Sequence, residues 1–195
     1  MLTNPGFEDP ILAGGDIPGA VGWTSFGNTF TIKVAPHSGD NALKMFGGCC
    51  SRVFQQFAIN PGETGNGGAW VLNPSFDALA GGQVGAVNIE WIQADGSTQS
   101  TITPFISNGM TDANQPLGDQ PSDYVLRTVT GVAPADAAFG RFVLITGDFA
   151  PGGPGGAPFY DDAFYEVLPV PEPSSMALGT LGLMALRGLA RRRDR

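Results

Sequence analysis

Charged residues are scarce in this 195-residue chain, at 14% of the sequence, and they sum to a net charge of −8. The imbalance lies in the body: residues 1–169 hold 16 acidic and 5 basic side chains, a net of −11, whereas residues 170–195 hold 2 acidic and 5 basic, a net of +3. An acidic body repels the phosphate backbone of nucleic acids. We therefore expect no nucleic-acid partner, while neutral sugars and divalent cations remain compatible with the charge.

Groups suited to nucleophilic or metal catalysis are equally few. His37 is the one histidine, it lies in a turn-like stretch beside Ser38, and no Gly-x-Ser-x-Gly motif accompanies it. Cys49 and Cys50 are adjacent and lack the CxxC spacing, so they are either two thiols or a strained disulfide between neighbours. No pair of carboxylates is singled out by its spacing. We therefore predict no catalytic residues and a protein that is not an enzyme.

An export signal is not recognised at the N-terminus. Met1 is followed by Leu2-Thr3-Asn4-Pro5, without the basic start and the apolar stretch of a signal peptide. We therefore expect this chain to contain no N-terminal export signal of its own.

Glycine and proline are plentiful, with 29 and 16 residues, and 42% of the chain is hydrophobic. This mixture favours short strands joined by many turns, because glycine and proline interrupt helices. The expected strands are Thr29–Val34, Ala42–Phe46, Val53–Ile59, Ala69–Leu72, Val84–Ala94, Ser100–Ile106, Tyr124–Val132, Arg141–Thr146 and Phe159–Val167.

Alternation of side chains supports these strands. Val87, Ile89 and Trp91 share one face, opposite Asn88 and Glu90, as in a half-buried strand. Asp95-Gly96 predicts the turn of a hairpin, and the polar stretch Ser107–Asp123 predicts a surface loop. The fold class is therefore all-β, a two-sheet sandwich. We expect domain boundaries at 1–168 for this sandwich, 169–175 for a Pro-rich linker and 176–195 for an apolar helix with an arginine-rich end.

The C-terminal segment combines proline, an apolar run and arginines. Met176–Leu186 carries no charge, and Arg187 then interrupts the run. As a helix, residues 176–190 would be about 22 Å long, at about 1.5 Å per residue. A membrane core is about 30 Å thick, so the segment is short for a stable span. The arginines would stay on the cytoplasmic side and leave residues 1–169 outside. The alternative is an ordinary amphipathic helix packed on the body.

This order resembles the PEP-CTERM sorting signal of Gram-negative bacteria. The matching residues are the motif Val170, Pro171, Glu172, Pro173 and Ser174, then the apolar run, then Arg191, Arg192 and Arg193. The resemblance implies an exported protein of the cell envelope or extracellular matrix. It also implies a transient membrane anchor at the C-terminus and an exosortase-type processing enzyme as partner.

The body contains a series of short motifs whose order is more informative than any one of them. It opens with Asn4-Pro5-Gly6-Phe7-Glu8, continues with His37-Ser38-Gly39-Asp40-Asn41-Ala42-Leu43, and ends with Phe159-Tyr160-Asp161-Asp162-Ala163. The order resembles the galactose-binding-like jelly roll of carbohydrate-binding modules. The resemblance covers about residues 3–168 and implies a jelly-roll sandwich.

The same resemblance implies a structural calcium ion that ties the first strand to the last. Glu8 and Asp162 are the implied carboxylate ligands, with Asp40 or its neighbouring backbone nearby. Calcium prefers several oxygen ligands, which chain-distant segments can supply together. The alternative is that Asp161 and Asp162 are solvated strand-end residues and that Glu8 caps a turn.

Sugar binding needs exposed aromatic rings, because flat rings stack on pyranose faces. Trp91 alternates with core residues, and Trp23 occupies a position that usually packs the sandwich in the resembling family. Trp70 and Tyr124 therefore remain as the ligand-binding candidates.

Three functions follow from these observations. The first is a cell-surface or extracellular-matrix protein with a non-catalytic jelly-roll domain. The second is a carbohydrate-binding module that recognises an exopolysaccharide or another glycan, and the third is a small glycan-active enzyme.

Overall fold

The computed structural model of the chain describes residues 1–47, 51–97, 105–111, 114–148 and 155–169. These residues form twelve strands and two short 3₁₀ helices. In chain order the elements are β1 (Ile17–Pro18), β2 (Thr24–Phe26), β3 (Thr29–Ile32), β4 (Ala42–Met45), β5 (Ser51–Ala58), β6 (Thr64–Pro74), η1 (Ser75–Asp77), β7 (Gln83–Gln93), β8 (Phe105–Met110), β9 (Leu117–Gly118), η2 (Pro121–Asp123), β10 (Val125–Val132), β11 (Ala137–Asp148) and β12 (Phe159–Leu168).

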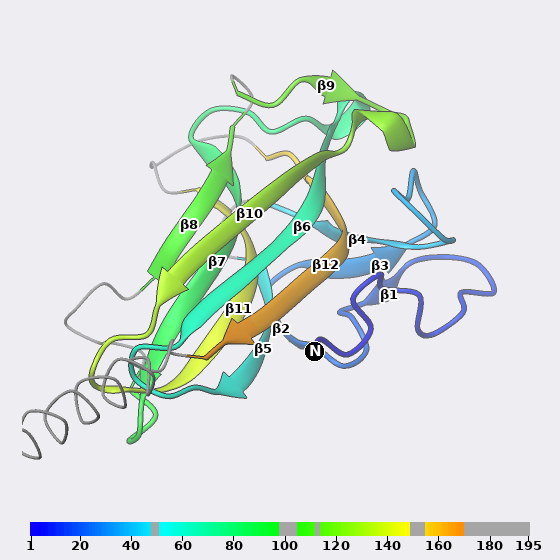
Figure 1. Cartoon of the computed structure of the whole chain (residues 1–195). Helices are drawn as coiled ribbons and strands as arrows, with labels where there is room; N and C mark the ends of the chain where they lie inside the picture. Colours follow the sequence, from blue (N-terminus) through cyan, green and yellow to red (C-terminus); the bar gives the residue numbers. More distant parts are fainter. Residues whose placement is uncertain (48–50, 98–104, 112–113, 149–154, 170–195) are drawn as a thin grey trace, which may run out of the picture.

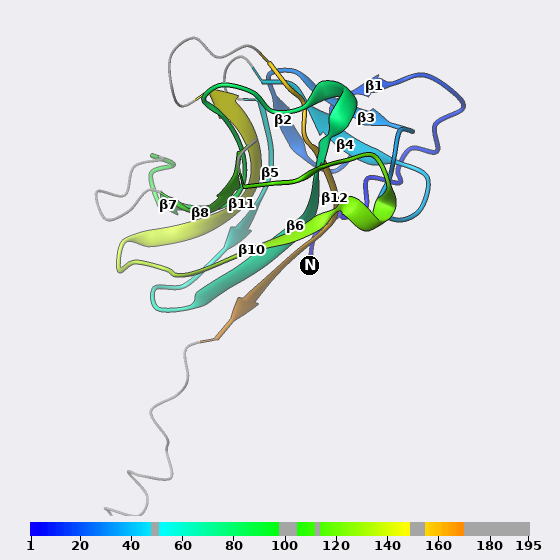
Figure 2. The same cartoon turned by 90° about the horizontal axis from the view of Figure 1, so that it is seen from above.

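The strands form two sheets that pack face to face (Figures 1 and 2). The seven-stranded sheet has the order β1-β3-β4-β12-β6-β10, with β9 added parallel to β6, and the five-stranded sheet has the order β2-β5-β11-β7-β8. The last strand, β12, lies between β4 and β6. This order brings the C-terminal part of the body against its N-terminal part, and it confirms the predicted all-β, two-sheet sandwich.

The core lies between the sheets and follows the predicted alternation. Val87 and Ile89 are fully buried, and Trp91 is 1% exposed. They pair across the sheet with Leu144, Phe142 and Gly140 of β11, on the same inner face. Trp23 is also in this core, as expected, with its ring 5.4 Å from that of Phe7. The predictions for Trp23 and Trp91 are therefore confirmed.

A second, smaller cluster lies on the outer face of the seven-stranded sheet. Ile32, Leu72, Tyr124 and Phe159 are buried there, and Trp70 packs against them. The pairing of β6 with β12 explains this location. Val71 and Tyr160 are paired and point into the core, so the next pair, Leu72 and Phe159, points to the outer face. This cluster makes that part of the sheet buried on both faces.

The predicted polar loop Ser107–Asp123 differs from the structure. It contains the end of β8, the short strand β9 and the helix η2. Asn108 and Gly109 look like loop residues, but they pair with Val87 and Ala86 of β7, and the Asn108 amide donates to the Thr128 carbonyl oxygen at 3.0 Å. Pairing between strands has overridden local polarity here.

Some expectations fall outside the described residues. They concern Cys49 and Cys50, the start of the expected strand Ser100–Ile106, the linker after Pro169 and the apolar helix. Strand β12 ends at Leu168, and the three domain boundaries remain a prediction. Among the described ranges, no helix is long and apolar enough to cross a membrane.

Candidate functional site

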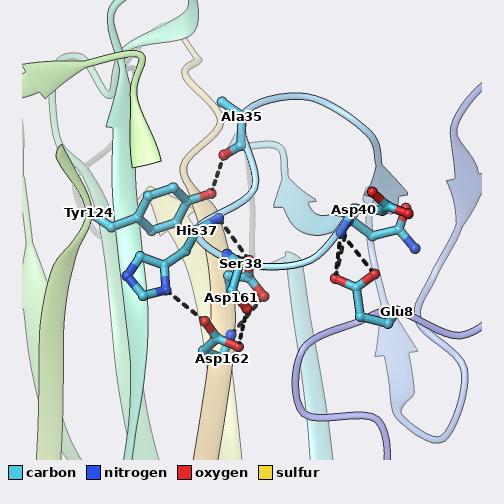
Figure 3. A network of polar contacts seen from close by, with 9 residues as sticks. Glu8, Ala35, His37, Ser38, Asp40, Tyr124, Asp161 and Asp162 are labelled. Carbon is cyan, nitrogen blue, oxygen red and sulfur yellow. Dashed lines mark hydrogen bonds and ion pairs between the residues drawn. The ribbon is translucent and has the colours of Figure 1, made fainter. Parts of the chain in front are cut away.

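Three acidic side chains bind the loop before β4 where the N-terminal segment meets β12: Asp161 and Asp162 at one end of the loop and Glu8 at the other (Figure 3). Asp161 is fully buried, and its Oδ2 accepts the backbone N–H groups of His37 at 2.9 Å and Ser38 at 3.2 Å. The pKa of Asp161 is raised to about 7, mainly by burial; the N–H bonds that it accepts oppose this rise, and the neighbouring Asp162 carboxylate adds to it. Asp161 therefore holds the loop before β4 against the last strand.

A bulge in β12 turns the next carboxylate to the same loop. The pairing of β12 with β6 is interrupted between Asp161 and Phe164, and Asp162 has a φ of 44°. In a regular strand, neighbours point to opposite faces. Here Asp162 contacts His37 Nδ1 at 2.6 Å and accepts the Ser38 hydroxyl at 2.9 Å. Both neighbouring aspartates therefore bind the loop before β4.

Glu8, from the first segment of the chain, binds the other end of the same loop (Figure 3). Its carboxylate accepts the N–H groups of Asp40 and Asn41, at 3.1 Å. Gly6 lies between the three acids: a Cβ on it would be 3.5 Å from Asp162 Oδ1, 3.7 Å from Glu8 Cγ and 3.9 Å from Asp161 Oδ1. The first and last segments therefore meet around Gly6.

The structure brings together two of the three expected metal ligands. Glu8 and Asp162 lie beside Gly6, whereas Asp40 has an exposed side chain and contacts Glu8 through its backbone N–H. Asp161 was not among the expected ligands, and it is the buried acid of this junction. Two adjacent aspartates give no sign in the sequence of which one is buried. Within the described part of the chain, no three acidic, histidine or cysteine side chains form a group that could hold a metal ion.

The sole histidine packs between two aromatic rings. Its ring is stacked on Trp70, with centroids 4.2 Å apart and planes 16° apart, and it lies 5.2 Å from Tyr124. Tyr124 is 4% exposed and donates its hydroxyl to the Ala35 carbonyl oxygen at 2.8 Å. Burial is the main cause that raises the Tyr124 pKa.

The two ligand-binding candidates are therefore placed differently from the expectation. Tyr124 was expected to present an exposed ring, and this expectation is wrong, because packing with His37 and the second cluster buries it. Trp70 is half-buried and has one face covered by His37.

Ser38, His37 and Asp162 are not arranged for nucleophilic catalysis. A serine nucleophile is activated when its hydroxyl is bonded to the histidine. Here the Ser38 hydroxyl is bonded to Asp162, and His37 is bonded to the same carboxylate. The contacts tie a loop to β12, and the absence of an enzymatic activity remains a prediction.

A different set of side chains lies in register on the outer face of the five-stranded sheet. Phe26 pairs with Arg52, Phe54 with Val143, and Arg141 with both Gln56 and Glu90. Figure 2 shows the strands of this sheet bending along their length. The middle of the face is buried, since Val143 is fully buried and Asn88 is 3% exposed, while Phe26 at its β2 side is 58% exposed.

Ion pairs and cation–π contacts connect the side chains of this face. Glu90 lies between two guanidinium groups, 3.6 Å from Arg52 and 3.9 Å from Arg141. The Arg141 guanidinium carbon lies 4.7 Å from the centroid of Phe54, and that of Arg52 lies 5.6 Å from the centroid of Phe26. Sequence reasoning missed this face, because Phe26 and Arg52 are far apart in the chain and become neighbours only when β2 pairs with β5.

Residues 169–193 match the family model of the PEP-CTERM protein-sorting motif. The chain carries a PEP-CTERM sorting motif. The motif covers the tail that was recognised from Val170-Pro171-Glu172-Pro173-Ser174 and the final arginines, and it indicates a secreted protein that is targeted to the cell envelope. No curated protein is significantly similar to the chain in sequence.

The body ahead of the PEP-CTERM motif shares its fold with carbohydrate-binding modules. It is similar to the CBM22-1 xylan-binding domain of Xyn10C from Paenibacillus barcinonensis, with a TM-score of 0.51 and 13% identity over 84% of this chain and 91% of that domain. This likeness confirms the predicted jelly-roll fold and, at this identity, shows the fold alone.

Two larger proteins contain a similar unit. The enzymatically active domain of tailspike protein 4 from bacteriophage CBA120 matches with a TM-score of 0.50 and 12% identity, over 75% of this chain and 19% of that one. An arabinose-bound α-L-arabinofuranosidase matches with a TM-score of 0.50 and 16% identity, over 85% of this chain and 26% of that one. The PEP-CTERM chain thus spans a minor part of either protein.

Proposed function

We propose that this chain is an exported, non-catalytic cell-surface protein whose jelly-roll domain binds a polysaccharide on the outer face of its five-stranded sheet. The observation that carries the proposal is the row of Phe26, Arg52 and Phe54 beside Arg141 and Glu90 on that face. Sugar sites combine aromatic rings with a few oriented polar groups, and this face holds both.

Each kind of group would have a defined task. The Phe26 ring is 58% exposed and could stack on a pyranose face. The guanidinium groups and Gln56 donate hydrogen bonds to hydroxyls, and Glu90 accepts them.

Phe26→Ala tests the site, with Phe76→Ala as its matched control. Phe76 is also 58% exposed, but it lies in η1, next to Phe159 of the other sheet. In affinity electrophoresis with plant and bacterial polysaccharides, we expect Phe26→Ala to lose retention and Phe76→Ala to keep it. A polysaccharide ligand whose retention depends on Trp70 and not on Phe26 would move the site to the seven-stranded sheet and contradict the proposal.

The tail is proposed to act as a transient membrane anchor that an exosortase-type enzyme processes. Support comes from the PEP-CTERM match and from the short, Arg187-interrupted apolar run. Cell fractionation of chains with and without residues 170–195, each behind a verified export signal, tests this role. Equal retention of both forms in the envelope would refute it.

A structural calcium ion is proposed at the junction around Gly6. Glu8, Asp161 and Asp162 supply only oxygen donors, as calcium prefers, and they come from the first and last segments of the body. A buried carboxylate beside a second carboxylate is a costly arrangement that a cation would relieve. Within the described residues no three acidic, histidine or cysteine side chains form a metal-holding group, so the proposed site would need backbone carbonyl groups in its ligand set.

A further inference from the structure

We propose that the polysaccharide bound by the five-stranded sheet is acidic, with carboxylate-bearing sugars such as uronates that meet Arg52. This inference rests on the proposed binding face and names the chemical class of its ligand.

The first argument is the distribution of charge. Residues 1–169 hold 5 basic and 16 acidic side chains, so a cationic patch is unexpected anywhere on the body. Among the described residues, Arg52 and Arg141 nevertheless share one face with a single acid, Glu90. The other basic side chains are placed elsewhere: Lys44 pairs with Asp77, Arg127 bonds to Gln115, and Lys33 is exposed after β3.

The second argument is that Glu90 does not saturate the two arginines. Its oxygen atoms lie 3.6 Å and 3.9 Å from the nearest guanidinium nitrogens. Charge-assisted hydrogen bonds are shorter, at about 2.7–2.9 Å. The Arg141 Nε–H donates to Gln56 Oε1 at 2.9 Å, and this bond fixes the orientation of the Arg141 guanidinium. One carboxylate between two guanidinium groups leaves a positive charge and several N–H donors for a ligand.

The third argument is the exposure of Arg52 and the rings beside it. The side chain of Arg52 is 34% exposed, compared with 17% for Arg141, so Arg52 is the more accessible of the two. Its guanidinium carbon lies 5.6 Å from Phe26 and 5.7 Å from Phe54. A sugar ring stacked on Phe26 would therefore carry its substituents next to this guanidinium, and a planar guanidinium matches a carboxylate in two parallel hydrogen bonds.

The ligand pair that tests the inference is polygalacturonate and its fully methyl-esterified form, which share one backbone and differ in charge. We expect the full chain to bind polygalacturonate about tenfold more tightly than the ester, the effect of one charge-assisted hydrogen-bond pair. Raising the salt concentration should remove most of this difference, because salt screens exposed charges.

The variants are Arg52→Gln and, as a matched control, Lys33→Gln, which removes the same charge away from the face. Arg52→Gln should abolish the preference for the charged polymer, and Lys33→Gln should keep it. Arg52→Lys is the second variant, for use if Arg52→Gln does not fold, because it retains the charge. It should still weaken polygalacturonate binding, because an ammonium group lacks the planar fork.

The outcomes separate this inference from the proposed function. Equal affinity for the charged and the esterified polymer, unchanged in Arg52→Gln, would overturn the acidic ligand while polysaccharide binding stands. Equal losses in Arg52→Gln and Lys33→Gln would also overturn it, since the effect would then be one of net charge. No retention on any polysaccharide, charged or neutral, would overturn both proposals.

Discussion

The imidazole ring of His37 lies flat on the indole of Trp70, with centroids 4.2 Å apart. The same ring contacts Asp162 through Nδ1 at 2.6 Å, so one side chain connects the loop before β4 with two neighbouring strands. The stack covers a Trp70 face that would otherwise meet water. His37 is therefore a packing residue that closes the outer side of the second hydrophobic cluster.

Replacing His37 with alanine should expose Trp70 and loosen the loop. We expect a loss of about 1–3 kcal/mol in unfolding free energy, from one aromatic pair and one hydrogen bond. Tryptophan emission should shift to longer wavelength as the indole meets water. Denaturant titration and fluorescence spectra measure the two effects.

The emission shift can be assigned to one residue. Trp23 is 8% exposed and Trp91 is 1% exposed, so both remain buried in the main core. In a Trp70→Phe background the His37→Ala shift should vanish. A shift that persists there would mean that the core itself has opened.

Gly39→Ala should destabilise the chain more than Gly96→Ala does. Both glycines have positive φ, 60° and 82°, a conformation that costs other residues about 1–2 kcal/mol. A Cβ on Gly39 would lie 2.3 Å from Glu8 Oε1, whereas one on Gly96 meets nothing within 4 Å among the described residues. The difference in unfolding free energy between the variants therefore measures the cost of displacing the Glu8 carboxylate, and equal values would contradict this cost.

Two buried tyrosines should respond in opposite ways to loss of the hydroxyl. Tyr160 donates to the Ile145 carbonyl oxygen at 2.8 Å and shares a hydrogen bond with Thr146 at 3.0 Å, so Tyr160→Phe should cost about 1–2 kcal/mol. The Tyr165 hydroxyl is buried without a partner among the described residues, and burial raises its pKa to about 12. Tyr165→Phe should therefore be neutral or stabilising in thermal melts. A larger loss for Tyr165→Phe than for Tyr160→Phe would contradict the described hydrogen bonding.

Calcium should raise the melting temperature of the body if it binds at the proposed junction. An ion that binds only the folded state stabilises that state, and at excess ion the stabilisation grows with the logarithm of the ion concentration. The shift between excess calcium and a chelator should disappear in Glu8→Gln and survive in Asp40→Asn, because the Asp40 side chain is exposed. Identical melting curves with calcium and with chelator would remove the proposed site.

Regular strands were the most predictable part of the fold. Residues such as Val87, Ile89 and Trp91 alternate with polar neighbours, and this local pattern is enough to predict a strand and its buried face. The end of β8 was missed because Asn108 and Gly109 have no such pattern and are held by pairing with β7. The expected exposure of Tyr124 was wrong for a related reason, since His37 comes from a distant loop to cover it.

The acidic junction was predictable in part. The resemblance to carbohydrate-binding modules implied that the segments of Glu8 and Asp162 meet, and the two segments do lie together around Gly6. The roles of the neighbouring aspartates could not be predicted. They depend on the bulge after Asp161, which points both carboxylates at one loop.

The amino-acid sequence by itself determined the sorting motif of the tail and the β-sheet character of the body. Both are encoded in local order: Pro-Glu-Pro, an apolar run and arginines in the first case, and two-residue alternation between turns in the second. Only the tertiary structure decided which aspartate is buried, which rings are covered and which face carries Phe26, Arg52 and Arg141. The physical reason is that burial and charge proximity arise from pairing between strands far apart in the chain, which no local pattern specifies.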